Sequence, residues 1–85
     1  MTKVKICGLK TEEHVLTAIH SKADLIGFVF APSKRQISVK AAKNLASLIP
    51  ATIKKVGVVV NETSESLHHI FNEVGLDYIQ YHGDE

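Results

Sequence analysis

Apolar residues in this chain gather first in short blocks bounded by turn residues. The four blocks are Val4 to Cys7, Leu25 to Phe30, Ile53 together with Val56 to Val60, and Tyr78 to Tyr81. Their length predicts β-strands, and the unbroken run from Leu25 to Phe30 is typical of a strand covered on both faces.

Between these blocks, apolar residues recur every three or four positions, as they do along one face of an α-helix. Each such stretch begins after a hydroxyl side chain that can cap a helix, namely Thr11, Ser38, and Thr63 or Ser64. Pro50 ends the second stretch and Gly75 ends the third. The pattern therefore predicts the order βαβαβαβ.

Connections of this length hold a helix between strands, which makes the predicted sheet parallel and its crossovers right-handed. Two architectures fit: an open doubly wound sheet with helices on both faces, and the first half of a (β/α)₈ TIM barrel with all helices outside. The first strand–helix turn, Cys7 to Thr11, has neither a G-x-G-x-x-G pattern nor a P-loop, and polar residues follow all four strands. Both observations favour the barrel.

The composition excludes several classes of protein. With 85 residues, 45% of them hydrophobic, the chain has enough apolar side chains for one packed domain or part of one. A formal net charge of +1 gives no electrostatic reason to expect nucleic acid or an anionic membrane as a partner. A single cysteine, no signal-peptide core and no run near the roughly 20 apolar residues of a membrane span lead us to expect a cytoplasmic protein.

The carboxyl ends of parallel strands meet on one face of the sheet, where α/β proteins carry out their chemistry. Each of the four predicted strands ends in, or is followed by, a residue with a reactive or polar side chain. These are the thiol of Cys7, the guanidinium of Arg35, the amide of Asn61 and the imidazole of His82. Taken alone, each has an ordinary explanation, as a buried thiol, a solvated loop cation, a helix cap and a histidine bonded to the backbone.

The histidines do not form a metal-binding pattern. His68 and His69 are neighbours on a predicted helix and point in different directions, and His14 and His20 are not part of an H-E-x-x-H motif. We therefore expect no metal site.

Five blocks of sequence, spread over essentially the whole chain, carry a family resemblance: Lys5 to Leu9, Ala23 to Phe30, Ser33 to Ser38, Val56 to Asn61 and Ile79 to Glu85. In this order they closely resemble the amino-terminal part of the phosphoribosylanthranilate isomerase family of tryptophan biosynthesis. The resemblance implies that residues 1–85 are strands one to four and the first three helices of a single (β/α)₈ barrel, whose remainder is absent here.

The resemblance also implies an activity. The family performs an Amadori rearrangement of N-(5-phosphoribosyl)anthranilate to 1-(2-carboxyphenylamino)-1-deoxyribulose 5-phosphate, without metal or organic cofactor. Cys7 matches the family's general base, which removes the proton from ribose C2, and Arg35 matches the residue that meets the anthranilate carboxylate. His82 matches a position at the barrel mouth, which implies a role in the pocket for the phosphorylated substrate.

The family's general acid, an aspartate on a later strand, and the phosphate site after strands seven and eight correspond to positions beyond Glu85. Because positioning is worth about 7–11 kcal/mol in such reactions, we expect the 85 residues alone to be inactive. The alternative is a non-catalytic half-barrel or a small α/β binding module. In a half-barrel we expect the inner strand face and both sheet edges to lie open, so that the chain self-associates, by dimerising into a pseudo-barrel or aggregating, or stays molten.

Overall fold

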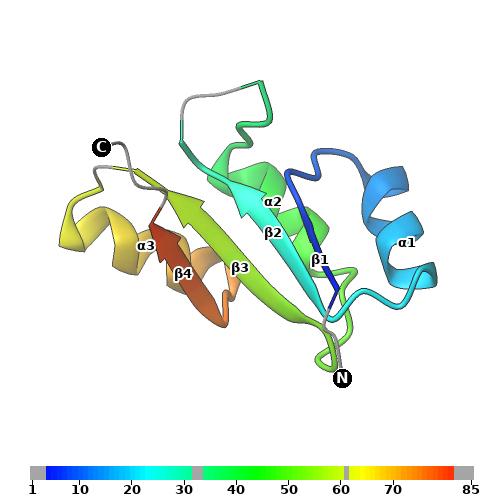
Figure 1. Cartoon of the computed structure of the whole chain (residues 1–85). Coiled ribbons are helices and arrows are strands. Elements are labelled where there is room, and N and C mark those ends of the chain that lie inside the picture. The colour runs from blue at the N-terminus through cyan, green and yellow to red at the C-terminus, as the bar shows by residue number, and fades with distance from the viewer. Residues whose placement is uncertain (1–3, 32–33, 61, 82–85) are drawn as a thin grey trace.

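The computed structural model describes residues 4–31, 34–60 and 62–81, and it confirms the predicted order βαβαβαβ (Figure 1). The elements are β1 (Lys5–Cys7), α1 (Glu12–His20), β2 (Leu25–Val29), α2 (Val39–Ala46), β3 (Lys54–Val59), α3 (Ser64–Val74) and β4 (Tyr78–Tyr81). Strand β3 lies within the predicted stretch that begins at Ile53 and ends at Val60, and it includes Lys54 and Lys55, which pair with β2 through their backbones.

The three helices begin where hydroxyl side chains can cap them. The side-chain oxygens of Thr11, Ser38 and Thr63 each accept a hydrogen bond of 3.1 Å from the backbone N–H three residues further on. Thr63, and not Ser64, is therefore the cap of α3. Helix α3 ends at Gly75, whose φ of +78° is the left-handed conformation that glycine adopts without strain.

All four strands are parallel, and each pairs with the strand that precedes it in the chain, in the order β1-β2-β3-β4. The register places Ile26, Phe28 and Val59 on one face of the sheet. These three side chains belong to a single apolar core with residues of all three helices, including Val15, Ala42 and Ile70. The helices therefore cover one face of the sheet, as in half of a (β/α)₈ barrel, whereas a doubly wound sheet has helices on both faces.

The sheet is curved, and its helix-free face is the concave one. Lys5 on β1 and Gln80 on β4 both lie on this face, and the Lys5 Nζ donates a hydrogen bond to the Gln80 Oε1. In a flat sheet these outer strands would lie about 14 Å apart, at about 4.8 Å per strand. The bond across two intervening strands therefore needs strong curvature.

We expected the inner face of the sheet to lie open, and this is wrong for the centre of that face. Val56 and Val58 lie on the concave face, outside the helix-side core, and yet are only 4% and 6% exposed. The reason is the curvature, which makes the inward side chains converge. Among the described large hydrophobic side chains, the two most exposed lie instead on β4, where Tyr78 and Tyr81 are 53% and 60% exposed.

At the amino ends of the strands, two aspartates make equivalent bonds. The Asp24 carboxylate, just before β2, accepts the Val4 N–H at 2.7 Å, and the Asp77 carboxylate, just before β4, accepts the Lys55 N–H at 2.9 Å. Each bond ties a strand to the strand before it. Among the described residues, the helices are all too short or too polar to cross a membrane.

Candidate active site

Cys7 is the last residue of β1 and lies at the carboxyl end of the sheet, half-buried. It pairs with Gly27 of β2, and the register places both on the concave face. A side chain at position 27 would occupy the space of the thiol, because a Cβ built there would lie 2.7 Å from the Cys7 Sγ. The thiol therefore rests directly over Gly27.

Gly8 connects Cys7 to the second candidate residue, Arg35. Its N–H donates to the Gly27 carbonyl at 2.9 Å, and its φ is +82°. A Cβ at Gly8 would lie 2.5 Å from the Arg35 Cδ and 3.3 Å from both Cβ and Cγ of Arg35. The alkyl part of Arg35 thus packs on the backbone of the residue that follows Cys7.

The loop that carries Arg35 is held against the sheet on both sides of that residue. Before it, the Lys34 carbonyl accepts a hydrogen bond of 3.2 Å from the Lys10 Nζ, which joins this loop to the one after β1. After it, the Gln36 side chain donates to the Phe30 carbonyl at 3.3 Å, and the Ile37 N–H donates to the Val29 carbonyl at 2.9 Å. These bonds hold the loop in the position in which Arg35 packs on Gly8, the residue that follows Cys7.

Two other candidates, His82 and Asn61, lie outside the residues that the structure describes. His14 and His20 are exposed on α1, which is on the side of the sheet away from Cys7. Within residues 4–31, 34–60 and 62–81, no three histidine, cysteine or carboxylate side chains gather as a metal site would require.

Sequence reasoning did not single out Lys5, Gln80 or Gly27 as site residues. Lys5 stands two positions before Cys7, so the two-residue period of a strand places both on the concave face. The two-residue period of the strand was therefore the signal in the sequence from which Lys5 could have been identified. The bond from Lys5 to Gln80, by contrast, joins residues 75 positions apart and follows only from the curvature of the folded sheet.

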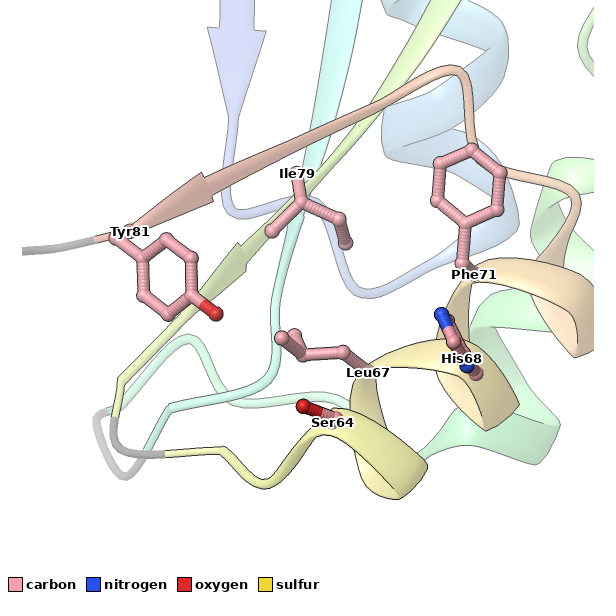
Figure 2. Close-up of a pocket in the computed structure, with 6 residues that line it drawn as sticks. All are labelled: Ser64, Leu67, His68, Phe71, Ile79 and Tyr81. Carbon is pink, nitrogen blue, oxygen red and sulfur yellow. The ribbon is translucent and has the colours of Figure 1, made fainter.

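A groove of about 250 Å³ lies on the opposite side of the sheet, between α3 and β4. Figure 2 shows the residues that line it: Ser64, Leu67, His68 and Phe71 from α3, and Ile79 and Tyr81 from β4. Because Ile79 and Tyr81 are in register with Gly57 and Val59, they point to the helix side of the sheet and away from Cys7. The groove is therefore separate from the candidate active site.

Comparison with known proteins gives a consistent result. The sequence model of the N-(5'phosphoribosyl)anthranilate (PRA) isomerase family matches residues 4–85. A PRA isomerase of Streptococcus pneumoniae, strain Hungary19A-6, is 58% identical over 83 residues, which are 98% of this chain and 42% of that protein. The chain thus spans less than half the length of the curated relatives that it matches.

Two solved structures extend the comparison. A PRA isomerase in complex with reduced 1-(o-carboxyphenylamino)-1-deoxyribulose 5-phosphate superimposes with a TM-score of 0.94 at 42% identity, over 100% of this chain and 44% of that one. A monomeric form of the dimeric Thermotoga maritima enzyme gives 0.91 at 42% identity, over 100% of this chain and 43% of that one.

Proposed function

The chain belongs to the PRA isomerase family, and from this premise we propose that it supplies the base and the carboxylate-binding residue of an isomerase active site. The complete enzyme converts N-(5-phosphoribosyl)anthranilate to 1-(2-carboxyphenylamino)-1-deoxyribulose 5-phosphate in tryptophan biosynthesis. Residues 1–85 are the amino-terminal portion of a single (β/α)₈ barrel, and the second half adds the general acid and the phosphate site. The 85 residues alone are inactive.

The observation that carries this proposal is the packing of Arg35 on Gly8, directly beside Cys7. It puts the side chain of a cation with a planar, bidentate head against the residue that follows the thiol, at the carboxyl end of the sheet. This is the end at which (β/α)₈ enzymes carry out their chemistry. A substrate that carries a carboxylate a few bonds from the reacting carbon fits this pair.

The chemistry assigns one step to Cys7. After the ribose ring opens, C1 is joined to the anthranilate nitrogen as an iminium, which makes the proton on C2 acidic. The Cys7 thiolate takes that proton, and the C–H electron pair forms the C1–C2 double bond while the iminium electrons return to nitrogen. The resulting enol becomes the C2 ketone when C1 gains a proton and the C2 hydroxyl loses one.

Arg35 binds the anthranilate carboxylate in this scheme. Arg35 is an exposed residue whose alkyl part packs on Gly8, and its loop is bonded to the loop after β1 and to the end of β2. His82, which follows β4, contributes to the same substrate pocket. The reaction requires neither a metal nor an organic cofactor, and the enzyme acts in the cytoplasm on a small phosphorylated substrate. Like the dimeric relative, the chain self-associates.

A fused protein tests the proposal. Residues 1–85 are joined to the part of the Streptococcus pneumoniae relative that follows its matched segment. We expect this chimera to restore growth without tryptophan to a bacterial strain that lacks PRA isomerase, and to show isomerase activity after purification. The pneumococcal part alone is the control. A chimera that unfolds cooperatively on heating but has no isomerase activity would contradict the proposal.

The Arg35→Lys variant of the chimera is expected to raise KM by about tenfold to a hundredfold with little change in kcat. Lysine keeps the charge but loses the bidentate contact, and hydrogen bonds to charged groups contribute about 1.5–3 kcal/mol. Steady-state kinetics with varied substrate measure the effect. Lys40→Ala, which removes an exposed cation on α2, is the matched control. An unchanged KM in Arg35→Lys would show that Arg35 does not bind the carboxylate.

A further inference from the structure

Two glycines lie directly beneath the two side chains of the candidate active site. Gly27 lies under the Cys7 thiol, and Gly8 lies under the alkyl part of Arg35. We propose that both are positioning residues: Gly27 sets where the thiol stands, and Gly8 sets where the guanidinium stands. This inference rests on the proposed function and extends it to residues that touch no substrate.

The backbone gives Gly27 no reason to be glycine. It lies in the middle of β2, paired on both sides, and its φ is outside the left-handed region. A glycine inside a strand weakens the strand, so its usual explanation is the close approach of another group. Here that group is the Cys7 Sγ, which would lie 2.7 Å from a Cβ at position 27, whereas ordinary contacts begin near 3.4 Å.

Alanine at position 27 would therefore displace the thiol, because the sulfur is the atom in the closest contact. The Cβ and Cα of Cys7 would lie at 3.4 and 3.5 Å, which are ordinary contacts. The strand itself does not have to move. A base displaced by about 1 Å from a reacting proton can cost about a hundredfold in rate.

Gly8 is constrained twice. Its φ of +82° strains any other residue, and its missing side chain leaves room for the Arg35 Cδ, which would lie 2.5 Å from a Cβ. Gly75 separates these two effects, because its φ is +78° and a Cβ there would meet nothing within 4 Å. Gly8→Ala and Gly75→Ala thus share the backbone strain, and only the first displaces Arg35.

Gly57 provides the matching control for Gly27. It is also a strand glycine, and a Cβ there would lie 2.5 Å from the Leu76 Cδ1, on the helix side of the sheet. Gly57→Ala therefore disturbs the packing of a strand by a comparable amount without touching Cys7 or Arg35. A decrease in kcat that is seen in Gly27→Ala but not in Gly57→Ala is therefore caused by displacement of the thiol.

The experiment measures kcat and KM for the four alanine variants of the chimera, at a temperature at which each is folded by circular dichroism. Gly27→Ala is expected to lower kcat about a hundredfold with KM unchanged. Gly8→Ala is expected to raise KM about tenfold or more with kcat nearly unchanged. Gly57→Ala and Gly75→Ala lower only Tm. Equal effects of Gly27→Ala and Gly57→Ala on kcat, or of Gly8→Ala and Gly75→Ala on KM, would overturn the proposal.

A second measurement needs no activity, so it separates this inference from the proposed function. If the clash at position 27 is with the sulfur, Gly27→Ala lowers Tm strongly when Cys7 is present. The same substitution made in the Cys7→Ala background is then expected to lower Tm only slightly. If Gly27→Ala alone fails to fold, the double variant is still expected to fold, because the sulfur that clashes with the new side chain has been removed. Strictly additive Tm changes would refute the contact. An inactive chimera that shows this non-additivity contradicts only the isomerase function.

Discussion

Replacing Cys7 with serine in the chimera is expected to lower kcat by about a hundredfold to ten-thousandfold while KM stays nearly constant. General base catalysis contributes about this range, and an alkoxide is far harder to form near neutral pH than a thiolate. The substitution changes one atom, and the side chain keeps its place over Gly27. Loss of kcat at constant KM indicates an interaction made only in the transition state.

The controls for this prediction are Cys7→Ala and Gly57→Ala. Cys7→Ala removes the base entirely, so its kcat is expected to be as low as that of Cys7→Ser. Gly57→Ala reports the effect of a packing change in the same sheet on the side away from the thiol. Near-normal turnover in Cys7→Ser would remove Cys7 from the role of base and leave Arg35 as the only assigned residue among those described.

The second large effect is expected in a polypeptide of residues 1–85 alone, which should self-associate instead of persisting as a compact monomer. In the described structure, β4 has a hydrogen-bonded neighbour on one side only, and an unpaired strand edge is a template for further pairing. Apolar surface gathers at the same place: Tyr78, Tyr81 and Phe71 are 53%, 60% and 37% exposed. This surface favours association through β4.

Light scattering after size-exclusion chromatography, together with proton NMR, measures this outcome. A paired substitution, Tyr78→Lys with Tyr81→Lys, is expected to shift the chain toward monomer. Leu16→Lys with Leu48→Lys, at residues that are 41% and 39% exposed on other parts of the surface, is the matched control and should have little effect. A sharp, dispersed spectrum from the unmodified chain at monomer mass would contradict the prediction.

The element order followed from local signals, which is why the sequence was sufficient to predict it. Side chains at Thr11 and Ser38 make the capping bonds within three residues, and Gly75 adopts the left-handed end of α3. Ile53 marked the start of β3 to within one residue, although Lys54 and Lys55 join the sheet through their backbones and give no apolar signal of their own.

The site was less predictable because it depends on contacts between distant segments. The roles of Cys7 and Arg35 came from a family resemblance, and residue chemistry alone gave both an ordinary structural explanation. Their closeness rests on two glycines, Gly8 and Gly27, where a side chain is missing. An absent side chain leaves no apolar or charged signal in a sequence. Its importance becomes visible only when the neighbouring atoms are in place.

The order of the strands has a consequence for synthesis on the ribosome. Each strand pairs with the one made just before it, and the Asp24 and Asp77 bonds join residues only 20 and 22 positions apart. No described strand needs a later strand in order to pair with the strand before it. All the residues that place the Cys7 thiol over Gly27 are thus available once β2 has left the exit tunnel, before β3 and β4 have been made.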